Sequence, residues 1–175
     1  MTISVKKIAC TLCLALPALW SVPALAEDPT LTLKVISEAG AQRALSAAEH
    51  EAERLHAPCA IAVVDSSGIL VAFLKMDGVR AGSPDLAIGK ARTSALLQRP
   101  SAETEANVDN GRVAFTTSGF MTLRGGVPLL AGKEVVGAIG VASLSKDNDV
   151  AIAQAAAAAF AALSSTQSQS QSPPH

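Results

Sequence analysis

CAIAVVDSSGILVAFLK, residues 59–75, is the stretch that decides the fold. Two apolar runs with strand propensity, Cys59–Val64 and Ile69–Lys75, flank the tetrapeptide Asp65-Ser66-Ser67-Gly68. Asp and Ser side chains hydrogen-bond back to a turn backbone, and Gly tolerates positive φ. Because so short a connection cannot join parallel strands, the stretch predicts an antiparallel hairpin.

A second hairpin is predicted from Val127–Ala131 and Glu134–Ser143, with Gly132-Lys133 at its turn. Gly137 and Gly140 lie inside its second strand. Glycine weakens a strand and often marks the close approach of another backbone or of a ligand. A bulge or tight helix packing explains these glycines equally well, so both interpretations stay open.

Helical patterns surround the hairpins. Leu31–His56 carries small and apolar residues at helical spacing, and Pro58 ends the pattern. A second helix is predicted from Ser83, its N-cap, to Leu97. Pro84 and Asp85 suit the first turn of that helix, because proline needs no N–H partner there and a carboxylate complements the helix dipole.

Two more helices follow. Ser101 is predicted to cap a short helix through Val108, and Ser145 or Asp147 to cap a last helix that ends near Leu163. Asp109–Arg124 receives no assignment and is either a functional loop or an irregular crossing. The order of helix, hairpin, two helices, hairpin and helix predicts an α+β fold with helices on an antiparallel sheet.

The chain ends predict processing. Lys6 and Lys7 precede the apolar run Ile8–Leu19, and Ala24-Leu25-Ala26 is typical of a cleavage site. That run is too short to span a bilayer. We therefore expect a signal peptide over residues 1–26, one domain over 27–163, and a periplasmic or secreted protein without a membrane span. Residues 164–175 are only Ser, Thr, Gln, Pro and His, which predicts a disordered tail.

Composition narrows the classes of partner. Removing the two signal lysines leaves 12 basic against 15 acidic residues, a net charge of 12 − 15 = −3. With four phenylalanines as the remaining aromatics, the mature chain is a poor nucleic-acid binder. Cys59 is then the only cysteine, which excludes an intramolecular disulfide. We interpret it as a buried, inert thiol; the alternatives are an intermolecular bridge or a thiolate ligand.

A series of short motifs occurs in a fixed order: Val64-Asp65 with Gly68, Met76-Asp77-Gly78, Ser83, Lys90-Ala91 with Thr93, Gly125-Gly126-Val127-Pro128, and Gly137-Ala138-Ile139-Gly140-Val141. In this order the chain resembles the GlcG/HbpS family of small haem-associated proteins, from about Leu31 to Ala162. The resemblance implies a profilin-like or PAS-like antiparallel sheet flanked by helices, in a single domain that forms homo-oligomers.

The resemblance also implies a ligand. Some relatives are secreted haem binders that degrade haem, so we expect a tetrapyrrole-binding protein and leave open whether it is an enzyme. Relatives that accompany glycolate catabolism give the alternative of an accessory protein or enzyme for small hydroxy acids, and a purely structural or sensory partner is a third. The stretch Ala142-Ser143-Leu144 departs from the Ser-Gly of many relatives, and without a Glu-x-x-Glu pair no iron site of that kind is transferred.

Ligand-binding candidates come from these motifs. Lys90 shares a helix face with Leu86 and Thr93, where its amine either holds a propionate or another carboxylate, or extends to water from a half-buried face. Thr93 either bonds the same ligand or its own preceding turn. The predicted ligand-binding set is Lys90, Thr93, Gly125, Gly126, Met76 and Asp77.

Histidines and sulfur offer iron ligands. His50 is either a solvated surface histidine or an axial haem ligand, while His56 suits a cation at a helix C-terminus. Met76 either ligates haem weakly or packs at a strand end, and Asp77 is better suited to a turn than to a catalytic base. No catalytic or metal motif can be read from the sequence.

Overall fold

The two predicted hairpins organise the fold. A computed structural model of the protein describes residues 30–170. In chain order the elements are α1 (Glu38–Arg54), β1 (Ala60–Asp65), β2 (Leu70–Lys75), α2 (Ser83–Leu97), α3 (Ser101–Asp109), the short 3-10 helix η1 (Val113–Thr117), β3 (Gly126–Ala131), β4 (Glu134–Ala142) and α4 (Lys146–Ser170).

The strands form one four-stranded antiparallel sheet in the order β2-β1-β4-β3. Both hairpins are confirmed, and pairing of β1 with β4 joins them, with Val63 opposite Ile139. The first turn forms as its sequence predicts, because the Asp65 carboxylate accepts the N–H groups of Ser67 and Ile69.

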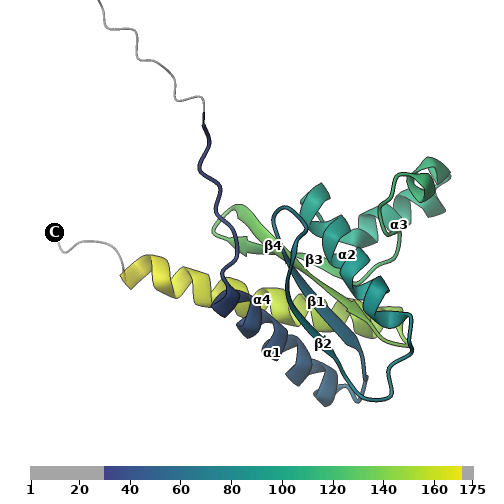
Figure 1. The fold of residues 1–175 in the computed structure, drawn as a ribbon, viewed down its shortest axis with the longest axis horizontal. Coiled ribbons are helices and arrows are strands. Elements are labelled where there is room, and N and C mark those ends of the chain that lie inside the picture. Colours follow the sequence, from purple (N-terminus) through teal and green to yellow (C-terminus); the bar gives the residue numbers. More distant parts are fainter. Residues whose placement is uncertain (1–29, 171–175) are drawn as a thin grey trace, which may run out of the picture. The chain divides into compact units, whose positions relative to one another are not determined.

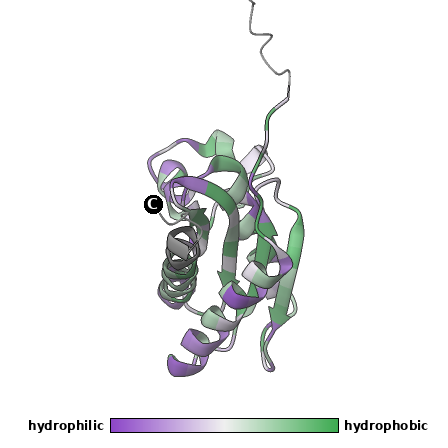
Figure 2. Ribbon diagram, turned by 90° about the vertical axis from the view of Figure 1, so that its left-hand side faces the viewer, coloured by the Kyte–Doolittle hydropathy of each residue, from purple (hydrophilic) through white to green (hydrophobic). Residues whose placement is uncertain are grey.

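Helices cover both faces of the sheet. α1 and α4 pack side by side on one face, and α2 lies on the other (Figure 1). The α1–α4 side buries large side chains such as Ile61, Ile139 and Ile152, whereas small residues such as Ala62 and Ala91 fill the α2 side. The strands are accordingly mostly green in Figure 2. The expected α+β fold is confirmed.

Glycines in the second hairpin admit α2. A Cβ on Gly140 would overlap the carbonyl of Ala87, and one on Gly126 would overlap the carbonyl of Lys90. The backbone of α2 therefore rests almost directly on β3 and β4. Of the two interpretations open for Gly140, tight helix packing is the observed one.

The start of α1 differs from the prediction. The helix begins at Glu38, because the Ser37 hydroxyl accepts the Gly40 N–H at 3.1 Å and caps it. The preceding residue, Ile36, instead donates its N–H to the Val136 carbonyl at 2.8 Å. A backbone hydrogen bond to β4 thus replaces the first helical turns predicted from Leu31.

Two predicted serine caps are wrong. α2 begins at Ser83 itself, Gly82 is the cap residue, and no side chain caps the helix. α3 likewise begins at Ser101, whose hydroxyl donates to the Leu123 carbonyl and accepts the Gly126 N–H. Ser101 therefore holds the loop before β3, an acceptor and donor role that local sequence does not reveal.

The last helix is longer than predicted. Ser145 is the capping residue, since its hydroxyl accepts the Asn148 N–H at 3.4 Å. α4 continues to Ser170, so residues 164–170 are helical where the sequence predicts a disordered tail; the alanine run before them propagates helix readily. The predicted signal peptide and residues 171–175 lie outside the described residues. Between residues 30 and 170, no helix is long and apolar enough to cross a membrane.

Candidate functional site

Lys90 lies in the protein interior. Its amine is 2.7 Å from the Asp149 carboxylate and donates to the Val141 carbonyl at 2.8 Å. The two charged side chains are only 3% and 4% exposed. A charge removed from water this completely needs both a counter-charge and hydrogen bonds, and Lys90 has them within the protein. The half-buried, water-reaching alternative is therefore not observed.

The same ion pair fixes the chain after β4. The second oxygen of Asp149 accepts the Ser143 N–H at 2.6 Å. Gly125 lies against this pair, where a Cβ would come within 2.9 Å of the Asp149 Cβ and 3.1 Å of the Lys90 amine. Gly125 also has φ of +112°, which suits glycine alone. Lys90 and Gly125 thus meet, as predicted, through a contact that joins α2, α4 and the start of β3.

Thr93 and Gly126 belong to the same contact region. The Thr93 hydroxyl accepts the Met121 N–H at 2.7 Å, instead of bonding its own preceding turn. The Gly126 N–H is bonded to Ser101. Four residues of the predicted ligand-binding set are therefore brought together, and their polar atoms bond protein partners.

The other predicted residues lie elsewhere. Met76 and Asp77 follow β2 at one end of the sheet, with Met76 half-buried and Asp77 exposed. The Cys59 thiol donates weakly to the Met76 sulfur at 3.9 Å. His50 is exposed on α1. The structure thus splits the predicted site into an interior cluster around Lys90 and a group of side chains near the ends of β2 and α1.

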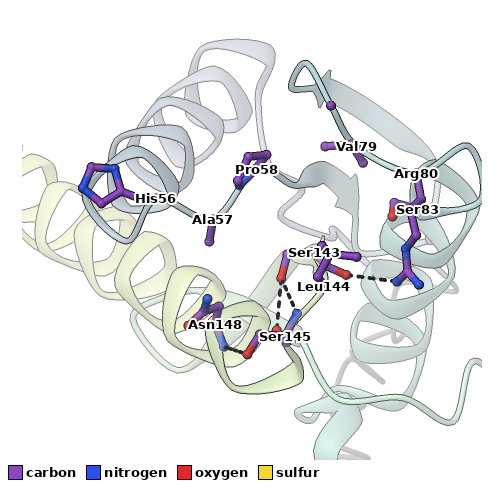
Figure 3. Close-up of a pocket in the computed structure, with 11 residues that line it drawn as sticks. His56, Ala57, Pro58, Val79, Arg80, Ser83, Ser143, Leu144, Ser145 and Asn148 are labelled. Atoms are coloured by element: carbon purple, nitrogen blue, oxygen red, sulfur yellow. Dashed lines mark hydrogen bonds between the residues drawn. The ribbon is translucent and has the colours of Figure 1, made fainter.

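A pocket of about 170 Å³ opens at that end of the sheet. Its walls come from the loops that follow α1, β2 and β4 and from the first turns of α2 and α4. Figure 3 shows Arg80 and Ser83 on one side, and Ser145 and Asn148 on the other. Its lining residues are His56, Ala57, Pro58, Gly78, Val79, Arg80, Ser83, Ser143, Leu144, Ser145 and Asn148.

The pocket is positively charged. Arg80 donates to the Ser143 carbonyl at 3.3 Å and is otherwise exposed, which leaves most of its five N–H donors unused. None of the described residues that line the pocket is Asp or Glu. The nearby Asp149 is committed to Lys90 and to the Ser143 N–H, so its charge is balanced behind the wall. A guanidinium, hydroxyls and a carboxamide can together hold an anion.

A wider hollow of about 390 Å³ adjoins this pocket and shares His56 with it. Its lining is apolar at Ala52, Pro58 and Met76 and charged at Glu53. His56 is exposed and has φ of +49°, an uncommon value for a residue other than glycine. The short chain from α1 to β1 imposes this conformation, because the Ala57 N–H bonds back to the Ala52 carbonyl. The His56 imidazole is thereby held beside both depressions.

Arg80 and the pocket role of His56 were missed by sequence reasoning, which interpreted His56 only as a helix-end cation. Their signal was available in part: a loop with two glycines, Gly78 and Gly82, leads into a proline-started helix, an arrangement that exposes a helix N-terminus. The approach of Ser145 and Asn148 from α4 has no local signal.

The described residues offer neither a metal-binding cluster nor a reactive thiol. Residues 30–170 contain no cluster of three or more His, Cys, Asp or Glu that could hold a metal ion. Burial raises the pKa of the Cys59 thiol to about 12, with further contributions from Asp149 and Glu49. The thiol is fully buried, as predicted, and stays neutral at physiological pH.

Fold and sequence together define a class of protein. The sequence model of the family described as "Haem degrading protein HbpS-like" matches residues 36–158, from the residue before the α1 cap into α4. That match spans most of the chain, and the chain belongs to this family.

Individual relatives agree. Protein GlcG of Escherichia coli K12 is 37% identical over 112 residues, which are 63% of this chain and 84% of GlcG. A double mutant of HbpS from Streptomyces reticuli has a TM-score of 0.68 and 31% identity, covering 79% of this chain and 96% of that one. The PduOC:Heme complex has a TM-score of 0.65 and 25% identity, covering 71% and 94%.

Proposed function

We propose that this protein binds haem. The observation that carries the proposal is the PduOC:Heme complex, a solved structure with the same fold and a known haem ligand. Membership of a family described by haem degradation supports it further. Degradation itself is a separate activity that the proposal does not include.

The chain's own residues fit such a ligand. The wide hollow beside α1 has apolar walls from Ala52, Pro58 and Met76, which suit a flat macrocycle, with the Glu53 carboxylate also in the lining. His56 on its edge supplies an imidazole, a common haem ligand, and Arg80 in the adjoining pocket supplies a cation for a propionate. Bound haem would supply iron redox chemistry, and the protein would supply orientation and polarity around it.

His50 is a second imidazole on the same helix, exposed on α1. Single variants separate the two histidines. Hemin titrated into the purified protein should give a saturable Soret shift. Either His56→Ala or His50→Ala should weaken binding at least about tenfold and change the spectrum, because a lost axial ligand alters iron coordination. The absence of any saturable Soret change in the unmodified protein would refute haem binding.

Export and assembly form part of the proposal. A signal peptide over residues 1–26 directs the chain to the periplasm or outside the cell, and a mature N-terminus at Glu27 in mass spectra tests this. A homo-oligomer is supported by apolar side chains on and beside β2: Ile69 and Phe73 are 59% and 38% exposed. Light scattering that gives a monomer would contradict it.

A role with small hydroxy acids is the second candidate function. The observation that favours it is the small, positively charged pocket beside Arg80, whose volume of about 170 Å³ lies below the roughly 300–1,000 Å³ of sites for larger ligands. Thermal-shift screening with short hydroxy acids tests this candidate separately from haem.

A further inference from the structure

Ser83 has an unused hydroxyl inside the pocket. The side chain is only 2% exposed, yet it makes no capping hydrogen bond and its hydroxyl has no partner within residues 30–170. Its backbone N–H is already bonded to the Arg80 carbonyl. The hydroxyl oxygen is not fully enclosed by the protein, because Ser83 lines the open pocket. A ligand atom in the pocket would supply that partner.

Arg80 lies on the same wall and has spare donors. Within the described chain, its guanidinium makes one hydrogen bond, to the Ser143 carbonyl, and no ion pair with a carboxylate. Figure 3 shows the Arg80 and Ser83 side chains beside each other at the pocket. A guanidinium next to a hydroxyl matches a carboxylate, whose two oxygens accept several hydrogen bonds.

The helix starts strengthen the positive potential. α2 begins at Ser83, and the first turn of α4 contributes Asn148 to the facing wall. Each N-terminus carries roughly half a positive charge. Three acids occupy these first turns. Asp149 is bonded to Lys90 and Asp147 lies 3.7 Å from Arg124. Asp85 of α2 is exposed and does not line the pocket, although its charge partly offsets that helix end.

Size and lining restrict the ligand. About 170 Å³ is small beside the roughly 300–1,000 Å³ of pockets for drug-sized molecules, so a macrocycle cannot enter. Val79 and Leu144 offer apolar contact for a short carbon chain, and the Asn148 carboxamide, which makes no side-chain hydrogen bond in the described chain, can bond a hydroxyl.

We propose that this pocket binds a short 2-hydroxy carboxylic acid, with the carboxylate on Arg80 and Ser83 and the hydroxyl toward Asn148. The inference rests on the second candidate function, to which it gives a site and a ligand class. It does not require haem binding, but the proposed haem site shares Arg80 and His56 with this pocket, so lactate and hemin should compete.

Calorimetric titration with lactate tests the proposal, and propionate measures the contribution of the hydroxyl. Lactate should bind saturably and more tightly than propionate. Arg80→Gln should weaken lactate at least about tenfold, and Ser83→Ala about two- to tenfold, in line with charged and neutral hydrogen bonds. Arg92→Gln is the matched control: this exposed arginine of α2 also bonds one backbone carbonyl, that of Gly68 at 2.9 Å, away from the pocket. Circular dichroism checks that each variant folds.

The outcomes separate the site from the function. If neither lactate nor any short hydroxy acid binds, both the site and the second candidate function fall. If lactate binds but Arg80→Gln and Ser83→Ala match Arg92→Gln, the function survives and this site does not. If inorganic phosphate competes as well as lactate, the pocket is a general anion site and the carboxylate assignment is overturned. Hemin binding should be retained in Ser83→Ala throughout.

Discussion

Replacing Lys90 by Met removes the cation of the buried ion pair and leaves Asp149 charged in the interior. The pair is 2.7 Å apart with side chains 3% and 4% exposed, so water cannot take the place of the missing amine. Removal of one partner from such a pair typically lowers the free energy of unfolding by about 3–5 kcal/mol. That loss is a large part of the ~5–15 kcal/mol of a typical domain, and we expect a clear shift in the urea midpoint.

A double-mutant cycle isolates the pair. Asp149→Asn removes the charge but keeps an oxygen that can accept the Ser143 N–H, so it tests the ion pair more than the backbone contact. The double variant Lys90→Met with Asp149→Asn should lose less stability than the sum of the single variants, because no uncompensated charge remains. Lys133→Met is the control; this exposed lysine in the second hairpin turn should change stability by less than about 0.5 kcal/mol.

Urea unfolding followed by far-ultraviolet circular dichroism measures all five proteins: the unmodified protein, the two single variants, the double variant and the control. A loss below about 1 kcal/mol for Lys90→Met, the range of solvent-exposed pairs, would refute the reasoning. It would mean that the amine reaches water or a ligand in the working protein, as the alternative interpretation of the sequence supposed. An additive cycle would likewise show that Lys90 and Asp149 do not depend on each other.

Two further predictions concern other buried groups. Burial raises the pKa of the Cys59 thiol to about 12, so the native protein should resist iodoacetamide near neutral pH and react once urea exposes the thiol. Peptide mass spectra measure the labelling. Labelling of the native protein at the rate of a free thiol would contradict this prediction. Burial raises the pKa of the Glu105 carboxyl, but hydrogen bonds from Arg124 and Lys146 outweigh it and hold that pKa below its ordinary value. The ionised Glu105 carboxylate therefore stabilises the fold above the pKa of about 4.3 that a glutamate has in the unfolded chain, and this stabilisation is lost as the pH falls through the lower pKa of the folded state. Glu105→Gln should lower the free energy of unfolding by on the order of 1 kcal/mol at neutral pH, a modest loss because both cations are partly in water. The difference in unfolding free energy from the unmodified protein should shrink in acid. An equal difference at both pH values would exclude an ionic origin.

Local chemistry accounts for the parts of the fold that could be predicted. The Asp65 turn and the glycine-lysine turn at 132–133 fix short-range geometry, so both hairpins follow from sequence alone. Serine caps were less predictable, because a hydroxyl can satisfy distant groups as well as its own helix. Ser37 caps α1, whereas Ser101 bonds the loop before β3.

The interior cluster shows that sequence can group residues without revealing their partners. Motif order predicted that Lys90, Gly125 and Gly126 lie together, and they do. A lysine beside glycines was interpreted as a ligand-binding arrangement because Asp149, its counter-charge, is 59 residues away in sequence. Only tertiary pairing reveals that the carboxylate facing the amine belongs to the protein itself.

The pocket follows from strand direction more than from any motif. β1 starts where its antiparallel neighbours β2 and β4 end, so the chain segments just before β1 and just after β2 and β4 must meet at one edge. Each of these three segments contributes one pocket residue: His56, Arg80 and Ser145. No local motif marks any of them as a ligand contact. The buried Lys90–Asp149 pair then holds the Ser143 N–H in the pocket wall. The residue chosen from sequence as the ligand contact thus supports the site from behind, while Arg80, one turn before α2, supplies the cation that faces the pocket.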